Sequence, residues 1–390
     1  MKWIKRFLLI FLVLLMTGAV VFFFFAAKMV DKQMNHVTLT ELPKVSQKAQ
    51  KLHETLNIAD WHSDNLLWDR NILKRSKHGQ VDVPKLLEGN VTLQVFDAVI
   101  KSPKGQNYNS NSDDTDNITL LAMGNRWSFR TWGSLCERAV YQSELLHKAE
   151  KNSNGQLKII RTRGDLQNFL TARKSNKKQV AGMLSIEGLH ALEGKLENVE
   201  RLYKEGYRMY GLVHFFDNKV GGSSAGLKKG GLTDFGKQVI KKMEEKKILI
   251  DLAHASPKLI REVIKVANRP VVISHTGVKG THNSKRNLSD EELKMIAGTG
   301  GMIGIGFWAG AVGSIQPASI AKAMRYTANL VGINHVCLGS DFDGSVKTYF
   351  NAAQLIVLTE ALIKEGFSDA EIRKIMGQNQ IDFLLKNLPD

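Results

Sequence analysis

Apolar runs with the character of β-strands recur along the chain, and amphipathic helical patterns separate them. Each run is nearly continuous in apolar residues, which is typical of strands buried on both faces of a parallel sheet. Alternation of such strands with helices indicates a sheet covered by helices, and eight units predict a closed (β/α)8 barrel of the TIM type. The eight runs are IADWH (58–62), VTLQVFDAVI (91–100), QVAGMLSIEG (179–188), MYGLVHF (209–215), ILIDLAH (248–254), PVVISH (270–275), GMIGIGF (301–307) and HVCLGSDF (335–342).

Capping signals support helices between these runs. Ser289 with Glu292, and Ser368 with Glu371, match the capping box, in which a serine and an acidic side chain satisfy free backbone N–H groups at a helix start. Pro257 follows a serine, as expected of a first helical residue. Residues 101–130 are rich in Asn, Ser, Asp and Gly, and we expect them to form a long loop on the active-site face of the barrel.

The N-terminal pattern differs from the rest of the chain. After Lys2, Lys5 and Arg6, the run Phe7–Ala27 is uncharged, and its 21 residues would span about 30 Å of hydrocarbon as a helix. Cleavable signal peptides have shorter apolar regions of about 7–15 residues, so the run favours an uncleaved anchor, with cleavage after Ala26–Ala27 as the alternative. In both cases the positive flank stays inside, and the remainder faces the extracytoplasmic side.

The chain therefore divides into three predicted parts. Residues 1–30 form the membrane anchor or signal segment, residues 31–57 a polar, Lys-rich stalk and first helix, and residues 58–390 the barrel domain. The length of 390 residues agrees with this division, because α/β barrels use about 250 residues or more as one unit.

Composition narrows the classes of partner. With 43% hydrophobic and 24% charged residues the chain is an ordinary globular protein. Its 54 Lys and Arg against 38 Asp and Glu give a net charge of +16, which favours anionic surfaces, but no dense basic block carries interleaved aromatics, so we expect no nucleic-acid partner. Two cysteines, Cys136 and Cys337, exclude a disulfide scaffold and a Cys-rich zinc module, and the apolar setting of Cys337 predicts a buried thiol.

Polar side chains collect where the predicted strands end. In a barrel these ends converge on one mouth, so residues far apart in sequence become neighbours there. Imidazoles and carboxylates together suit Zn²⁺ or a similar divalent ion, and a carboxylate between them could bridge two metals, which generate hydroxide and polarise a carbonyl. Each residue alone is weak evidence, because a single His or Asp at a strand end is usually structural. The residues are His62, Asp64, Glu187, His214, His254, His275, Asp341 and Asp343.

These residues lie in segments that resemble the membrane dipeptidase (renal dipeptidase) family of zinc peptidases. The resemblance is collinear from about residue 55 to 385, and several motifs in fixed order make it specific. The segments are DWHSDN (60–65), SIEGLH (185–190), LVHFFDNKVGGS (212–223), GLTDFGKQVIKKM (231–243), DLAHAS (251–256), ISHTGV (273–278), RNLSDEEL (286–293) and GSDFDG (339–344).

The resemblance implies a two-zinc centre and a role for each site residue. His62 and Asp64 would bind one zinc ion, His254 and His275 the other, and Glu187 would bridge them. The remaining roles concern the substrate. His214 would contact the scissile carbonyl or its oxyanion, Arg286 would hold the terminal carboxylate through its forked guanidinium, and Asp341 would carry the proton from the water to the leaving amine.

We therefore expect a membrane-anchored, extracytoplasmic zinc dipeptidase that uses a metal-bridged hydroxide, with Glu187, His214 and Asp341 as its catalytic groups. The first alternative is a hydrolase with the same centre that acts on N-acyl amino acids, lactones or lactams. The second is a binding protein that kept the barrel without activity, although none of the five expected ligands is missing. Metal identity, dipeptide preference and a homodimer stay open. Animal members of the family have disulfides and a C-terminal lipid anchor, and this chain has neither pattern.

Overall fold

The computed structural model describes residues 2–390, and its centre is a closed barrel of parallel strands. Within these residues, eight strands follow the order β2-β1-β9-β8-β7-β6-β5-β4, and pairing of β2 with β4 closes the ring. The predicted (β/α)8 barrel is confirmed. The strands are β1 (Ile58–Asp60), β2 (Val91–Val99), β3 (Leu157–Ile159), β4 (Val180–Glu187), β5 (Tyr207–Gly211), β6 (Leu249–Asp251), β7 (Val272–Thr276), β8 (Met302–Ile305) and β9 (Val336–Leu338).

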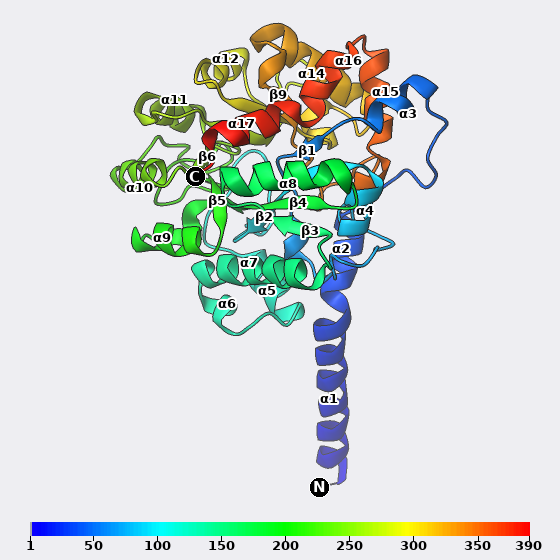
Figure 1. Ribbon diagram of the computed structural model, residues 1–390. Helices are drawn as coiled ribbons and strands as arrows, with labels where there is room; N and C mark the ends of the chain where they lie inside the picture. The colour runs from blue at the N-terminus through cyan, green and yellow to red at the C-terminus, as the bar shows by residue number, and fades with distance from the viewer. Residues whose placement is uncertain (1) are drawn as a thin grey trace.

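Helices surround the barrel on its outside, except for α1, which extends away from it, and the chain ends close to α8 (Figure 1). The helices of the chain are α1 (Lys2–Val21), α2 (Ala27–Met34), α3 (Gln47–His53), α4 (Val83–Glu88), α5 (Asn117–Gly124), α6 (Arg130–Gly133), α7 (Leu135–Asn152), α8 (Arg163–Ser175), α9 (Glu197–Lys204), α10 (Asp234–Glu245), α11 (Pro257–Val266), α12 (Asp290–Gly298), α13 (Ala309–Val312), α14 (Pro317–Val331), α15 (Ile356–Lys364), α16 (Asp369–Arg373) and α17 (Asn379–Asn387). The capping boxes predicted at the starts of α12 and α16 are both formed, and Pro257 is the first residue of α11.

Three short elements, β3, α5 and α6, were not expected from the sequence. Strand β3 pairs with the first three residues of β4, and its three residues, with Lys158 exposed between two buried positions, are too few to form a recognisable run. The stretch 101–130 is not a continuous loop, because α5 lies within it and α6 begins at its last residue. Asp116 caps α5 by accepting a hydrogen bond from the N–H of Ile118, a local signal that the polar composition of the whole stretch obscured.

The barrel interior changes from apolar to polar along the strands. Alternate residues of a strand share one face, so β4 points Ala181, Met183, Ser185 and Glu187 to the same side. Ala181 and Met183 belong to the apolar cluster at the amino ends of the strands, which α17 covers. Ser185 and Glu187 continue this face to the carboxyl end, where both are buried. The sequence of β4 therefore makes the barrel interior apolar at the amino end of the strand and polar at its carboxyl end.

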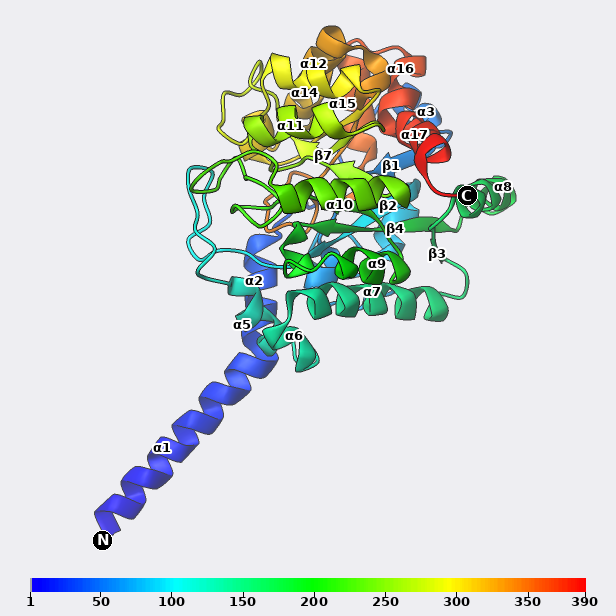
Figure 2. The same ribbon diagram turned by 90° about the vertical axis from the view of Figure 1, so that its left-hand side faces the viewer.

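The N-terminal helix is continuous from Lys2 to Met34 and is apolar and long enough to cross a membrane. Its first part extends freely away from the barrel, whereas α2 lies against it (Figure 2). A π-helical turn, Phe22–Ala26, joins the two parts. After α2, Val37 pairs with Thr348, so the chain stays in contact with the barrel before α3. The predicted boundaries at residues 30 and 57 stay a prediction.

Buried ion pairs connect this helix to the loop that follows β9. Asp31 is buried, and its carboxylate lies 3.1 Å from Arg70 Nε and 3.1 Å from His78 Nε2 and accepts a hydrogen bond from Asn35 Nδ2. A guanidinium nitrogen of Arg70 lies 2.9 Å from Asp343 Oδ1. Removal of one partner from a buried ion pair strongly destabilises a protein, because the other charge is left buried without a partner. These pairs therefore fix the position of the helix relative to the loop.

A buried histidine near α3 makes stability depend on pH. His53 contacts Thr359 Oγ1 at 2.9 Å and the carbonyl oxygen of Gly89 at 3.2 Å. Burial lowers the pKa of His53 from 6.5 to about 4. The unfolded chain therefore binds a proton more readily than the folded chain, and stability falls as the pH drops from 6.5 toward 4, by up to about 3 kcal/mol.

We expect the variant His53→Gln to lack this part of the pH dependence. Denaturant unfolding of both proteins in detergent at pH 7 and pH 4 measures it, because the free energy of unfolding of the wild type should fall by the larger amount. Equal losses in the two proteins would contradict the assignment to His53.

Candidate metal centre

The predicted site residues come together at the carboxyl ends of the strands. Of the eight residues to which the resemblance gives a role, seven line one cavity of about 110 Å³, and the eighth, His62, is fully buried beside Glu187. The volume is below the roughly 300 Å³ typical of sites for drug-sized ligands, so the cavity suits a small substrate. The seven are Asp64, Glu187, His214, His254, His275, Arg286 and Asp341.

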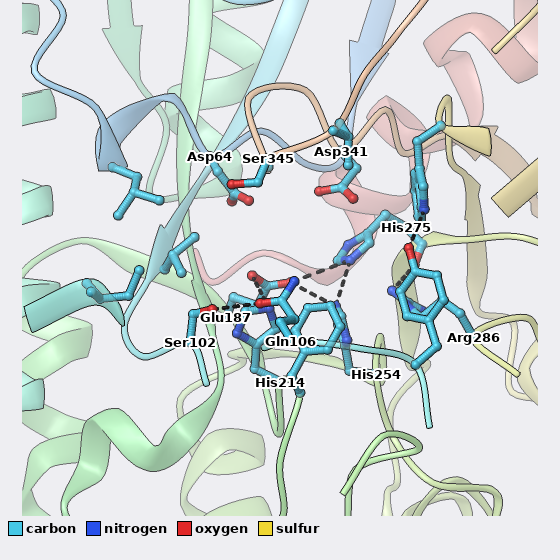
Figure 3. Close-up of a pocket in the computed structure, with 18 residues that line it drawn as sticks. Asp64, Ser102, Gln106, Glu187, His214, His254, His275, Arg286, Asp341 and Ser345 are labelled. Atoms are coloured by element: carbon cyan, nitrogen blue, oxygen red, sulfur yellow. Dashed lines mark hydrogen bonds and ion pairs between the residues drawn. The ribbon is translucent and has the colours of Figure 1, made fainter. Parts of the chain in front are cut away.

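Glu187, the last residue of β4, lies in the middle of the imidazoles. Its Oε1 atom is 3.1 Å from His254 Nε2 and 3.4 Å from His275 Nε2, and its Oε2 atom is 3.1 Å from His214 Nε2. The Nε2 atoms of His254 and His275 are 3.0 Å apart. Figure 3 shows these side chains converging on one point, from β4 and β7 and from the loops that follow β5 and β6.

His62 and Asp64 complete the cluster from the end of β1. His62 Nε2 lies 3.1 Å from Asp64 Oδ1 and 3.8 Å from both Glu187 Oε1 and Asp341 Oδ1. Burial opposes a charge on His62, but Asp64 and Asp97 outweigh burial and raise its pKa well above 6.5. A metal ion bound to this imidazole would therefore displace a proton.

Burial and mutual repulsion set the charges of the other groups. Burial first, and then the charge of Asp64, raise the pKa of Glu187 well above its usual range, and burial is also the main cause of the raised pKa of Asp341. Burial lowers the pKa of His254 and His275 well below 6.5, so both imidazoles are neutral, which is the form that binds metal ions. A divalent cation would relieve the repulsion among the acids and use these free lone pairs.

The donor atoms are spaced as metal ligands. Two nitrogen ligands of a tetrahedral zinc ion lie about 3.3 Å apart when each Zn–N bond is near 2.05 Å, close to the separation of His254 and His275. Donor atoms in each of three groups lie within 4.8 Å of one another. The residues present therefore fit a divalent metal centre, while the division of ligands between two ions stays a prediction. The groups are His62, Glu187 and His275; Glu187, His214 and His254; and His62, Asp64 and Asp341.

Two site residues occupy left-handed backbone conformations that side chains rarely adopt. His254 has φ 63° and Asp341 has φ 61°, and such conformations persist only where the surroundings hold them. The N–H of Ser224 donates a hydrogen bond to the carbonyl oxygen of His254. Next to Asp341, Ser340 donates to Asp60 Oδ2 through its hydroxyl at 2.5 Å and to Asp60 Oδ1 through its N–H at 2.8 Å.

Asp341 and Asp343, which compete for one role in the sequence, have different surroundings. Asp341 lines the cavity, whereas Asp343 is fully buried and points away from it. The Asp343 carboxylate accepts hydrogen bonds from the N–H groups of Gln80 and Val81 and pairs with Arg70. Asp343 therefore fixes the loop, and Asp341 is the carboxylate available to a substrate.

Arg286 approaches the cavity from the loop before α12. It is buried, one guanidinium nitrogen donates to the carbonyl oxygen of His275 at 3.1 Å, and the guanidinium lies 5.9 Å from the ring of Trp308. Trp308 in turn donates through Nε1 to the hydroxyl of Tyr108 at 2.9 Å. Arg286 thus lies beside an aromatic wall, with donor capacity left for an anionic group.

The sequence reasoning missed the residues that orient the ligands. Asp97 Oδ2 lies 3.2 Å from His62 Nδ1, and Ser274 Oγ lies 2.9 Å from His275 Nδ1. Ser274 also donates to Asp251 Oδ2 at 2.6 Å. Partners of this kind fix the orientation of a metal-binding imidazole. The available signal was a lone carboxylate inside an apolar run, as in VTLQVFDAVI and ILIDLAH.

Comparisons with known proteins give a family match and similar folds. A family model described as membrane dipeptidase (peptidase family M19) matches residues 46–384. Dipeptidase verJ from Clonostachys rogersoniana is 26% identical over 245 residues, which cover 61% of this chain and 62% of that protein, so the match spans less than two thirds of this relative.

Two solved structures share the fold. The probable dipeptidase PvdM from Pseudomonas aeruginosa has a TM-score of 0.73 at 20% identity, covering 88% of this chain and 98% of that one. A metallo peptidase from Rhodobacter sphaeroides, liganded with a phosphinate mimic of the dipeptide L-Ala-D-Ala, has a TM-score of 0.69 at 22% identity, covering 86% and 99%. At these identities the likeness shows the barrel and leaves substrate preference open.

Proposed function

Because the chain belongs to the membrane dipeptidase family, peptidase family M19, we propose that it is a metal-dependent dipeptidase that hydrolyses the peptide bond of dipeptides. The observation that carries the proposal is the convergence of three imidazoles on the Glu187 carboxylate, with Arg286 and Asp341 lining the same cavity. This arrangement provides separate groups for a metal centre, for a substrate carboxylate and for proton transfer.

We propose that His62, Asp64, Glu187, His254 and His275 are the metal ligands. We also propose that the centre holds two zinc ions. Bound there, zinc would supply Lewis-acid chemistry, which lowers the pKa of a water molecule and polarises the carbonyl. The protein contributes the rigid positions of the ligands and their orientation by buried hydrogen bonds. Zn²⁺, Mn²⁺ and Co²⁺ all accept these ligand types, so the metal content of the protein is part of the test.

The remaining residues act on substrate and proton. The water oxygen forms a bond to the carbonyl carbon while Asp341 accepts the proton, and His214 donates a hydrogen bond to the resulting oxyanion. The carbon–nitrogen bond then breaks, and Asp341 returns the proton to the leaving amine. His214 lines the cavity, and its Nε2 points toward Glu187. Because its Nδ1–H donates to the carbonyl oxygen of Lys101 at 3.2 Å, donation from Nε2 to the oxyanion requires the imidazolium form of His214.

We also propose that the enzyme is anchored in a membrane by its N-terminal helix and works on the extracytoplasmic side. The helix Lys2–Met34 supports this placement by its length and apolar composition, and Lys2, Lys5 and Arg6 at its start favour a cytoplasmic N-terminus. The barrel lies at the other end of the helix, so it would face the opposite side of the membrane (Figure 1).

Metal removal tests the proposed function. We expect the full-length protein in detergent to contain about two divalent ions per chain and to cleave L,L- or L,D-dipeptides. Treatment with a chelator should abolish this activity, and zinc should restore it. Metal without dipeptide cleavage would shift the substrate to an N-acyl amino acid, a lactone or a lactam. Cleavage that survives complete metal removal would contradict a metal-dependent mechanism.

The variant Arg286→Lys tests how the substrate carboxylate is held. Lysine keeps the charge but loses the forked pair of donors, so KM for a free dipeptide should rise by roughly 10- to 100-fold, equivalent to about 1.5–3 kcal/mol. The same dipeptide with an amidated C-terminus is the matched substrate. The wild type should prefer the free acid, and the variant should lose most of this preference. An unchanged preference would mean that another group binds the carboxylate.

A further inference from the structure

The N-terminal helix leaves the barrel beside helices α5 and α6. Figures 1 and 2, at right angles to each other, both show these two helices on the side of the barrel from which α1 extends. A β-carbon built on Gly124, the last residue of α5, would lie 3.5 Å from Ala27 Cβ and 3.6 Å from the carbonyl oxygen of Phe22. The end of α5 is therefore level with residues 22–27 of the long helix.

This level coincides with the end of the apolar run. A membrane helix needs about 20 apolar residues to cross the hydrocarbon, and counting from Phe7 places the outer boundary near Ala26. The guanidinium of Arg126 lies 5.0 Å from the ring of Phe24, which also places a charged group beside this part of the run. In the proposed anchored state, the segment 117–133 therefore lies at the height of the lipid headgroups.

The same segment carries unusually exposed apolar side chains. Phe129 is 78% exposed, more than any other large apolar side chain described outside α1, and Leu120 is 59% exposed. The Phe129 ring packs against Trp132, with ring centroids 4.3 Å apart. Exposed aromatic and aliphatic groups beside a membrane helix are typical of segments that enter the boundary between headgroups and acyl chains.

We propose that α5 and α6, residues 117–133, form a second membrane contact in which Leu120 and Phe129 enter the outer leaflet beside the anchor helix. This inference rests on the proposed membrane anchoring. The proposal also gives a role to the whole segment between β2 and α7. The beginning of this segment lines the active-site cavity through Ser102, Gln106 and Tyr108, and its later part would contact the membrane. The contact would hold that side of the cavity near the lipid surface.

Apolar insertion, and not charge, drives the proposed contact. Arg126 lies 3.4 Å from Asp69, and Arg130 pairs with Glu137 and Glu144, so these arginines are already neutralised by neighbouring acids. The contact should therefore form on a zwitterionic phosphatidylcholine bilayer and change little with salt. A second copy of the chain could also cover Phe129. However, Phe129 lies level with the end of the apolar run, and this position favours lipid as the partner.

Spin-label depth measurements test the proposal in the full-length protein. Nitroxides are attached singly at Phe129→Cys, Leu14→Cys and Val266→Cys in phosphatidylcholine nanodiscs, since the native Cys136 and Cys337 are both buried. Position 14 reports on anchoring. Val266, the last residue of α11, is exposed and serves as the control, because α11 lies far from α1 in both views. Oxygen concentrates in lipid and a nickel complex in water, so the ratio of their collision rates reports depth.

We expect a lipid-like ratio at positions 14 and 129 and an aqueous ratio at 266. A lipid-like ratio at 14 with an aqueous ratio at 129 would overturn the second contact and leave the anchor intact. Low collision rates for both reagents at 129 would mean that protein covers it and would also overturn the proposal. An aqueous ratio at 14 would remove the anchoring on which the inference rests, while dipeptide hydrolysis, measured separately, would still test the proposed function.

Discussion

Replacing Glu187 by glutamine should lower dipeptide hydrolysis by roughly 10³-fold or more, because it removes the carboxylate that is proposed to bridge the two metal ions. Glu187 is the only carboxylate within 3.5 Å of His214, His254 and His275 among the described residues. Glutamine has nearly the same shape, so packing around β4 is kept. We therefore expect the bound metal to fall below two ions per chain in the same variant, as measured by elemental analysis of the purified protein.

The matched control is Glu292→Gln. Glu292 is also buried, but it accepts hydrogen bonds from Ser289 at the start of α12, a capping role that glutamine can fill. This variant should keep metal content and activity close to those of the wild type. If Glu187→Gln retained two ions and full activity, Glu187 would have no part in the centre.

The variant Asp341→Asn should lower kcat by about 10²- to 10⁴-fold while KM and metal content change little, because asparagine cannot carry a proton between water and amine. The variant Asp343→Asn should show the opposite pattern. It breaks the buried pair with Arg70, at a cost of about 3–5 kcal/mol of stability, but leaves the cavity lining intact. Kinetics and thermal unfolding of both variants measure the two effects. Equal loss of kcat in both would contradict the assignment of the proton carrier to Asp341.

The barrel could be predicted because its strands are buried on both faces and so read as continuous apolar runs. The site could be predicted in outline for a related reason, since the chain places His62, Glu187, His254 and His275 where these runs end, and parallel strands end at one mouth. The resemblance to a known family then supplied a role for each residue. These roles stay predictions until the variants are measured.

What could not be predicted depends on contacts between distant segments. Asp97 looks like one polar residue in an apolar strand until the barrel closes and brings its carboxylate to His62 Nδ1. The capping signal at the start of α5 is a weak sequence signal within such a polar stretch. The apolar partners of α5 come from distant segments, namely Leu67, Trp68, Val99 and the N-terminal helix. Strand β3 exists because β4 offers a free edge at its first three residues.

The junction between the N-terminal helix and the barrel sets how far the enzyme can reach. A flexible tether would let the barrel sweep a hemisphere above the bilayer, as a glycine-rich linker does. Here the helix is continuous and Asp31 pairs with Arg70, so no flexible joint separates the N-terminal helix from the barrel. In the proposed anchored state, catalysis would be confined to a thin layer at constant height above the bilayer, and substrates would have to diffuse into that layer.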